Sequence, residues 1–167
     1  MTNIIATLPK VDLYRDFCSS ISPGILREKL GKRADKLTAW RSFDSVAGFS
    51  SACDKIRGIL AEGSDYEQAA VGVLEELVER SIVHSEFHLD PLAKKVPIEV
   101  QVARIDVGHE LVTEEQEDAL VSYGYILELD RTADTAAQKD AISRALEATT
   151  KVLAVAIVGK EQALSSE

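Results

Sequence analysis

Polar side chains that could carry acid–base chemistry follow the apolar segments of this chain at regular points. Aspartate, glutamate and histidine can exchange protons near neutral pH, and tyrosine and arginine can bind polar ligands. If the apolar segments are parallel strands, their carboxyl ends meet at the edge of the sheet where barrel enzymes carry their chemistry. We therefore predict candidate catalytic residues at Asp16, Glu86, His88 and Glu161, and candidate ligand-binding residues at Tyr14, Arg15, Arg131 and Gly159.

A buried ion-pair network is the other interpretation of these residues, with Arg15 and Arg131 pairing with the acids, because buried polar groups need partners. A metal site is not predicted. His84 and His88 would share one face of a strand, but they lack His-x-His or HExxH spacing, and His109 lies in a predicted loop. We expect no metal ligands and no cofactor.

Four apolar segments are predicted as strands, and they alternate with helical segments in a way that favours a parallel α/β sheet. The wholly apolar fourth segment is expected to be covered on both faces. A further stretch, 98–105, alternates like a strand that belongs to this sheet or to a side hairpin. The four predicted strands span residues 10–13, 82–89, 125–129 and 152–158.

The helices are predicted from their caps and from apolar residues spaced by three and four. Ser22 precedes the first helix, and Asp44 or Ser45 caps a second helix whose apolar side includes Cys53. A Ser64-x-x-Glu67 pattern is expected to cap a third helix. The predicted helices span 23–33, 46–60, 66–80, 113–122 and 135–150.

Composition narrows the class of protein. The chain has 167 residues, a length that suits a single domain over 1–167. Its net charge of −9 opposes binding to nucleic acid or anionic membranes, and its 5% aromatic residues oppose stacking on nucleic-acid bases. It has no apolar run near the roughly 20 residues that span a bilayer and no secretion-signal pattern. The two cysteines form no metal or disulfide motif, so we expect a reduced, cytoplasmic protein.

The stretch Leu8-Pro9-Lys10-Val11-Asp12-Leu13 resembles the first strand of the adenosine deaminase family of metal-dependent amidohydrolases. The segments Ser85-Glu86-Phe87-His88-Leu89-Asp90-Pro91 and Gly159-Lys160-Glu161 are similar to its Glu-x-Arg-x-x-Pro segment and its Gly-Asp-Glu corner. The resemblance covers the first four βα steps of an eightfold TIM barrel, and it implies half of such a barrel.

The departures from the family pattern concern its zinc site. Where the family has His-x-His, this chain has Tyr14 and Asp16; His88 stands where arginine is usual, and Ala156 where the family has an aspartate. The remaining zinc ligands and acid–base residues belong to the second half of the family barrel, which these residues do not match. The resemblance thus implies a deaminase-like scaffold with impaired zinc chemistry, a pseudoenzyme rather than an active deaminase.

Half of a barrel leaves two open strand edges and an inner apolar face without its other wall. A homodimer or a second protein could complete it, and we expect function through that association. The alternative is a small metal-independent enzyme, or a protein that binds a nucleoside-like ligand, with a site rebuilt at the strand ends. A hydrolase whose missing ligands come from a second subunit is the third possibility.

Overall fold

A four-stranded parallel sheet organises the fold of the computed structural model, which describes residues 7–30, 45–93, 95–115 and 121–159. The strands follow one another in the order β1-β2-β3-β4, each parallel to the next. The predicted parallel α/β architecture is confirmed, and the bounds of the second and fourth strands are as expected. The strands are β1 (Lys10–Asp16), β2 (Ile82–Leu89), β3 (Ser122–Asp130) and β4 (Val152–Val158).

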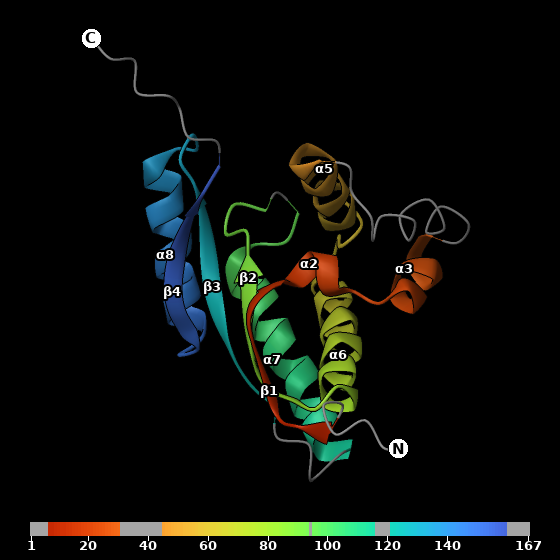
Figure 1. The fold of residues 1–167 in the computed structure, drawn as a ribbon. Helices are drawn as coiled ribbons and strands as arrows, with labels where there is room; N and C mark the ends of the chain where they lie inside the picture. The colour runs from red at the N-terminus through yellow and green to blue at the C-terminus, as the bar shows by residue number, and fades with distance from the viewer. Residues whose placement is uncertain (1–6, 31–44, 94, 116–120, 160–167) are drawn as a thin grey trace.

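Helices connect the strands, and Figure 1 shows α6, α7 and α8 on one side of the sheet. The Ser45 hydroxyl accepts a hydrogen bond from the Gly48 amide, so this predicted cap is confirmed. The Asp134 carboxylate caps α8 in the same way, by accepting a hydrogen bond from the Ala137 amide. The helices are α2 (Phe17–Ser20), α3 (Pro23–Leu30), α5 (Val46–Arg57), α6 (Gly63–Glu79), α7 (Ile98–Glu115) and α8 (Thr135–Ala148).

The stretch predicted as an additional strand is helical, and this prediction was wrong. Residues 98–105 open α7, where Ile98, Val102 and Ile105 are fully buried at helical spacing. Val100 packs partly against the core from a second side of the helix, and this produced the misleading alternation. The short helix predicted over 113–122 was wrong at both ends, because Thr113 belongs to the last turns of α7 and Ser122 begins β3. The Thr113 hydroxyl donates a hydrogen bond to the His109 carbonyl, and residues 116–120 lie outside the described residues.

The start of α6 also differs from the prediction. The helix begins at Gly63, and its capping box joins Glu62 to Asp65 rather than Ser64 to Glu67. The Asp65 carboxylate accepts hydrogen bonds from the amides of Ala61 and Glu62 at 2.8 and 3.1 Å. Asp65 is itself buried, and it supplies partners for two backbone amides just before the helix.

A polar network ties α7 to the amino-terminal end of the sheet, on the side that the helices cover. The Asp106 carboxylate accepts hydrogen bonds from the hydroxyls of Tyr123 and Tyr125 at 2.6 and 2.7 Å. It also accepts bonds from Lys151 Nζ and the Thr149 hydroxyl, both at 3.1 Å. Partial burial favours a raised pKa for Asp106, but the bonds from Tyr123, Tyr125 and Lys151 outweigh it and hold the pKa below its usual value.

The opposite face of the sheet is open. Phe87, Tyr125 and Leu127 are fully buried on the helical side, whereas Val11 is 58% exposed on the other side, opposite His84. Leu153 is 55% exposed and lies against the position where Gly124 would carry a Cβ.

β4 was expected to be covered on both faces, and that expectation was wrong for the described residues. Val155 pairs with Leu127 and Ile157 pairs with Leu129, so both lie on the helical side of the sheet. Both remain exposed all the same. In the described residues β4 is the last strand of the sheet, and the layer of helices ends at α8.

Candidate functional site

A β-bulge in β1 places the first candidate residues. Glu86 alone lies between Ser85 and Phe87 on β2, whereas Leu13 and Tyr14 together lie opposite it on β1. Leu13 and Tyr14 are accordingly 60% and 66% exposed beside the open face. The extra residue also sets Asp16 opposite His88 at the carboxyl end of the sheet.

Tyr14, His88 and Glu128 form one contact cluster from three neighbouring strands. His88 Nδ1 lies 3.2 Å from Glu128 Oε1, and the Tyr14 ring covers the imidazole with the two ring centres 4.1 Å apart. Partial burial, followed by the charges of Glu128 and Asp16, raises the pKa of Tyr14, so its phenol stays protonated. The Glu128 carboxylate orients the imidazole, and in the neutral ring this leaves Nε2 as the atom that can accept a proton.

The Asp16 side chain is buried and bonded to other groups of the protein. It is 7% exposed, and its Oδ1 accepts a hydrogen bond of 2.6 Å from the Ser19 amide at the start of α2. Its Oδ2 lies 3.2 Å from Arg57 Nη2. Both carboxylate oxygens are therefore engaged, as the ion-pair interpretation predicts, although the partner is Arg57 and not Arg15 or Arg131.

Arg57 was missed by the sequence analysis, because it lies 41 residues from its partner and no local motif marks it. Two buried cysteines share its surroundings. Burial, followed by the charge of Asp16, raises the pKa of Cys53 to about 12, and the same causes raise the pKa of Cys18. Both thiols therefore stay protonated at neutral pH, which favours a structural role over a reactive one.

Of the remaining candidates, Glu86 lies beside this cluster, opposite Tyr14 on the neighbouring strand and two residues before His88, whereas Arg15 and Gly159 have other surroundings. The Arg15 Nε atom lies 2.8 Å from Asp12 Oδ2, an ion pair that forms because the bulge turns both side chains to one face. Gly159 has a φ of 101°, a backbone conformation that favours glycine. Glu86 lies on the inner face at mid-strand, Arg131 follows β3, and Glu161 lies outside the described residues.

The residues present do not fit a zinc ion of the kind that the family resemblance implies. Zinc binds imidazole, thiolate or free carboxylate groups, whereas Tyr14 keeps its proton and both oxygens of Asp16 are held by Ser19 and Arg57. His84 and His109 have partners of their own, the Ser122 hydroxyl and the Val121 carbonyl, and His109 lies in α7 rather than in a loop. No group of three or more potential metal ligands gathers within the described ranges.

Known proteins resemble this chain in structure but not detectably in sequence. The sequence matches no protein-family model and no curated protein. Its structure matches a zinc-bound amidohydrolase from Burkholderia ambifaria with a TM-score of 0.77 at 17% identity, over 94% of this chain and 46% of that one. It also matches the Arabidopsis N6-mAMP deaminase with a TM-score of 0.75 at 17% identity, over 96% of this chain and 53% of the other.

An adenine deaminase from Arthrobacter aurescens matches with a TM-score of 0.73 at 18% identity, over 92% of this chain and 49% of the other. The chain has the fold of half of an adenosine-deaminase-like barrel. It spans about half the length of each of these solved structures, which confirms the partial-barrel prediction. Within the half-barrel, the helices that the structure describes include none long and apolar enough to cross a membrane.

Proposed function

We propose that this half-barrel has lost zinc-dependent deamination and works by association, pairing with a second copy of itself. The supporting observation is the uncovered inner face of the sheet, where Val11, Leu13 and Leu153 are each more than half exposed. Apolar side chains grouped in this way mark a surface that another protein covers. The relatives of this fold are about twice as long, so a second half-barrel is a partner of suitable size.

The geometry of the sheet specifies how two copies would meet. A twofold axis along the barrel axis would set β4 of one copy beside β1 of the other, twice, and all eight strands would remain parallel. Both open edges would then gain backbone hydrogen-bond partners, and the two inner faces would become one core. A twofold axis across the strands would make these new pairs antiparallel, which does not reproduce a barrel of parallel strands.

A charge placed on the inner face tests this pairing. We expect the unmodified chain to run as a dimer of 18.2 kDa subunits in light scattering, and Leu13→Asp to convert it to a monomer. Leu146→Asp is the matched control, because Leu146 has a similar exposed fraction but lies on α8. A monomeric unmodified chain across a wide concentration range would refute pairing with a second copy.

The loss of zinc chemistry has its own test. After incubation with zinc and removal of free metal, we expect no stoichiometric zinc by mass spectrometry and no ammonia from adenosine. Stoichiometric zinc would contradict this part of the proposal, whatever the oligomeric state.

A second candidate function is a metal-independent site for a nucleoside-like ligand, and the Tyr14–His88–Glu128 cluster favours it. The exposed Tyr14 ring could stack on a planar ligand while the His88–Glu128 pair exchanges a proton. A thermal-shift screen of nucleosides tests it, with His88→Ala expected to abolish any stabilisation. His84→Ala, on the same strand and face, should leave it intact. Failure of every nucleoside to stabilise the protein would count against this function.

A further inference from the structure

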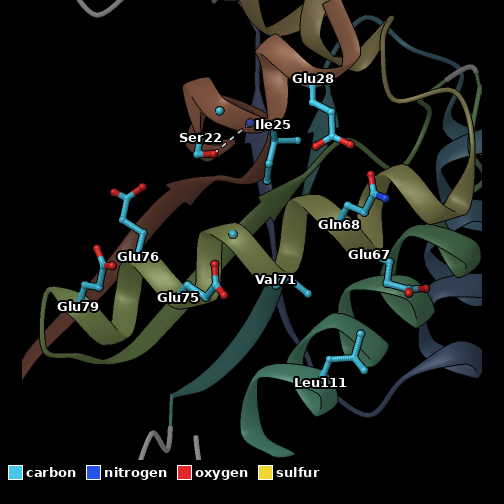
Figure 2. A pocket seen from close by; sticks show the side chains of 12 residues that line it. Ser22, Ile25, Glu28, Glu67, Gln68, Val71, Glu75, Glu76, Glu79 and Leu111 are labelled. Carbon is cyan, nitrogen blue, oxygen red and sulfur yellow. Dashed lines mark hydrogen bonds between the residues drawn. The ribbon is translucent and has the colours of Figure 1, made fainter. Parts of the chain in front are cut away.

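A groove of about 650 Å³ lies among α3, α6 and α7, away from the open face of the sheet. Its lining includes three apolar side chains, one from each helix: Ile25, Val71 and Leu111. Figure 2 shows Ile25 reaching from α3 toward α6, with Leu111 on α7 below. Leu111 is 42% exposed, so apolar surface at this groove remains in contact with water.

The groove exists because α3 rests on α6 at a glycine. A Cβ at Gly72 would lie 2.6 Å from Ile25 Cδ1, so the glycine leaves the space that the end of the Ile25 side chain occupies against α6. The Ser22 hydroxyl accepts a hydrogen bond from the Ile25 amide and fixes the start of α3 beside the groove. The apolar strip is thus held by packing on α6 and by a helix cap.

Glutamates surround this apolar strip, and several of them lack a cationic partner. Arg104 lies 3.0 Å from Glu67, and Arg80 lies 2.9 Å from Glu76. In the part of the chain that the structure describes, no ion pair involves the other three, and no lysine or arginine lines the groove. These three are Glu28, Glu75 and Glu79.

Glu75 and Glu79 are one helical turn apart on α6, where like charges destabilise a helix. A positively charged partner would remove that repulsion and cover the apolar strip at the same time. From Glu67 to Glu79 the helix rises about 18 Å, which is the length of about three helical turns. We propose that this groove binds a basic amphipathic helix of another protein, with its apolar side on Ile25, Val71 and Leu111.

A labelled helical peptide of leucine and lysine, with the leucines on one face, is a direct probe. Its affinity for the full chain can be measured by fluorescence anisotropy, and a peptide with glutamate in place of lysine serves as the comparison. We expect the double variant Glu75→Gln, Glu79→Gln to weaken binding about tenfold, since two exposed charge contacts are removed. The matched control is Asp140→Asn, Glu147→Gln, which removes the same charge from α8.

The apolar part of the groove is tested separately. Leu111→Ser should weaken binding of the leucine–lysine peptide. Leu146→Ser, which changes an exposed leucine on α8, should leave the affinity unchanged. Equal weakening by the two charge variants would show attraction to net charge alone and would overturn the proposal. Binding of the glutamate peptide with similar affinity would also overturn it. Circular dichroism of each variant confirms that the fold is kept.

Discussion

Removing the negative charge of Asp106 is expected to destabilise the fold by about 3 kcal/mol. The carboxylate accepts two short bonds from Tyr123 and Tyr125, and hydrogen bonds to charged groups contribute about 1.5–3 kcal/mol each, compared with about 1 kcal/mol for neutral ones. Asp106→Asn keeps the shape, so each tyrosine bond loses about 1 kcal/mol. The partly exposed Lys151 pair adds up to about 1 kcal/mol.

Urea unfolding followed by circular dichroism measures this difference, and pH gives it a second signature. The folded pKa of Asp106 lies below its usual value, so its contribution is complete above the unfolded value of about 3.9. It is lost as the pH falls through the folded value. Wild type and Asp106→Asn should therefore differ in unfolding free energy at neutral pH and converge only in acid.

The matched control for this experiment is Asp140→Asn on α8. Asp140 also pairs with a cation, Arg144 at 3.0 Å, but its side chain is 69% exposed. An exposed helical pair of this kind contributes about 0.3–0.5 kcal/mol. If the two variants destabilise the protein equally, the Asp106 network carries no special stability and the reasoning fails.

Two further predictions concern the candidate site and helix packing. Asp16→Ala should cost about 3 kcal/mol in urea unfolding, because it removes the cap of α2 and the buried carboxylate beside Arg57, which then keeps only the exposed Asp54 as a partner. It should leave zinc content unchanged, and a change in zinc content would assign Asp16 a metal role. Gly108→Ala should cost about 2 kcal/mol of folding stability, because the added Cβ would lie 2.8 Å from the Glu67 carbonyl oxygen. Gly24→Ala should not destabilise the protein, because the atom nearest to its added Cβ lies 3.6 Å away. Equal melting temperatures for the two variants would contradict the packing argument.

The strands could be predicted because their apolar runs are short and bounded by turn signals. Ile82–Leu89 and Val152–Val158 have the bounds expected from sequence. Ile98–Glu115 could not be assigned from its first residues, since it packs on more than one side and is rich in β-branched residues. Periodicity cannot separate such a helix from a strand until its full length is considered.

For three candidate residues, the sequence predicted the place in the sheet but not the side chains that they contact. Tyr14, Asp16 and His88 do lie at the carboxyl end of the sheet. Their partners, Arg57 and Glu128, come from segments 41 and 40 residues away, and such pairings depend on the fold. Glu128 lies near the end of its strand like the other candidates, so the rule covers it, although it was not among the chosen site residues.

The last strand, β4, has a composition that matters for the behaviour of the isolated protein. Its seven residues, Val-Leu-Ala-Val-Ala-Ile-Val, contain no charge, proline or glycine, whereas β1 at the other edge carries Lys10, Asp12, Arg15 and Asp16. Uncharged, β-branched edge strands are templates for cross-β stacking, and most proteins protect them with a lysine or a proline. A preparation in which β4 finds no neighbour should therefore form fibrils on storage, and a single lysine at Val155 should suppress them.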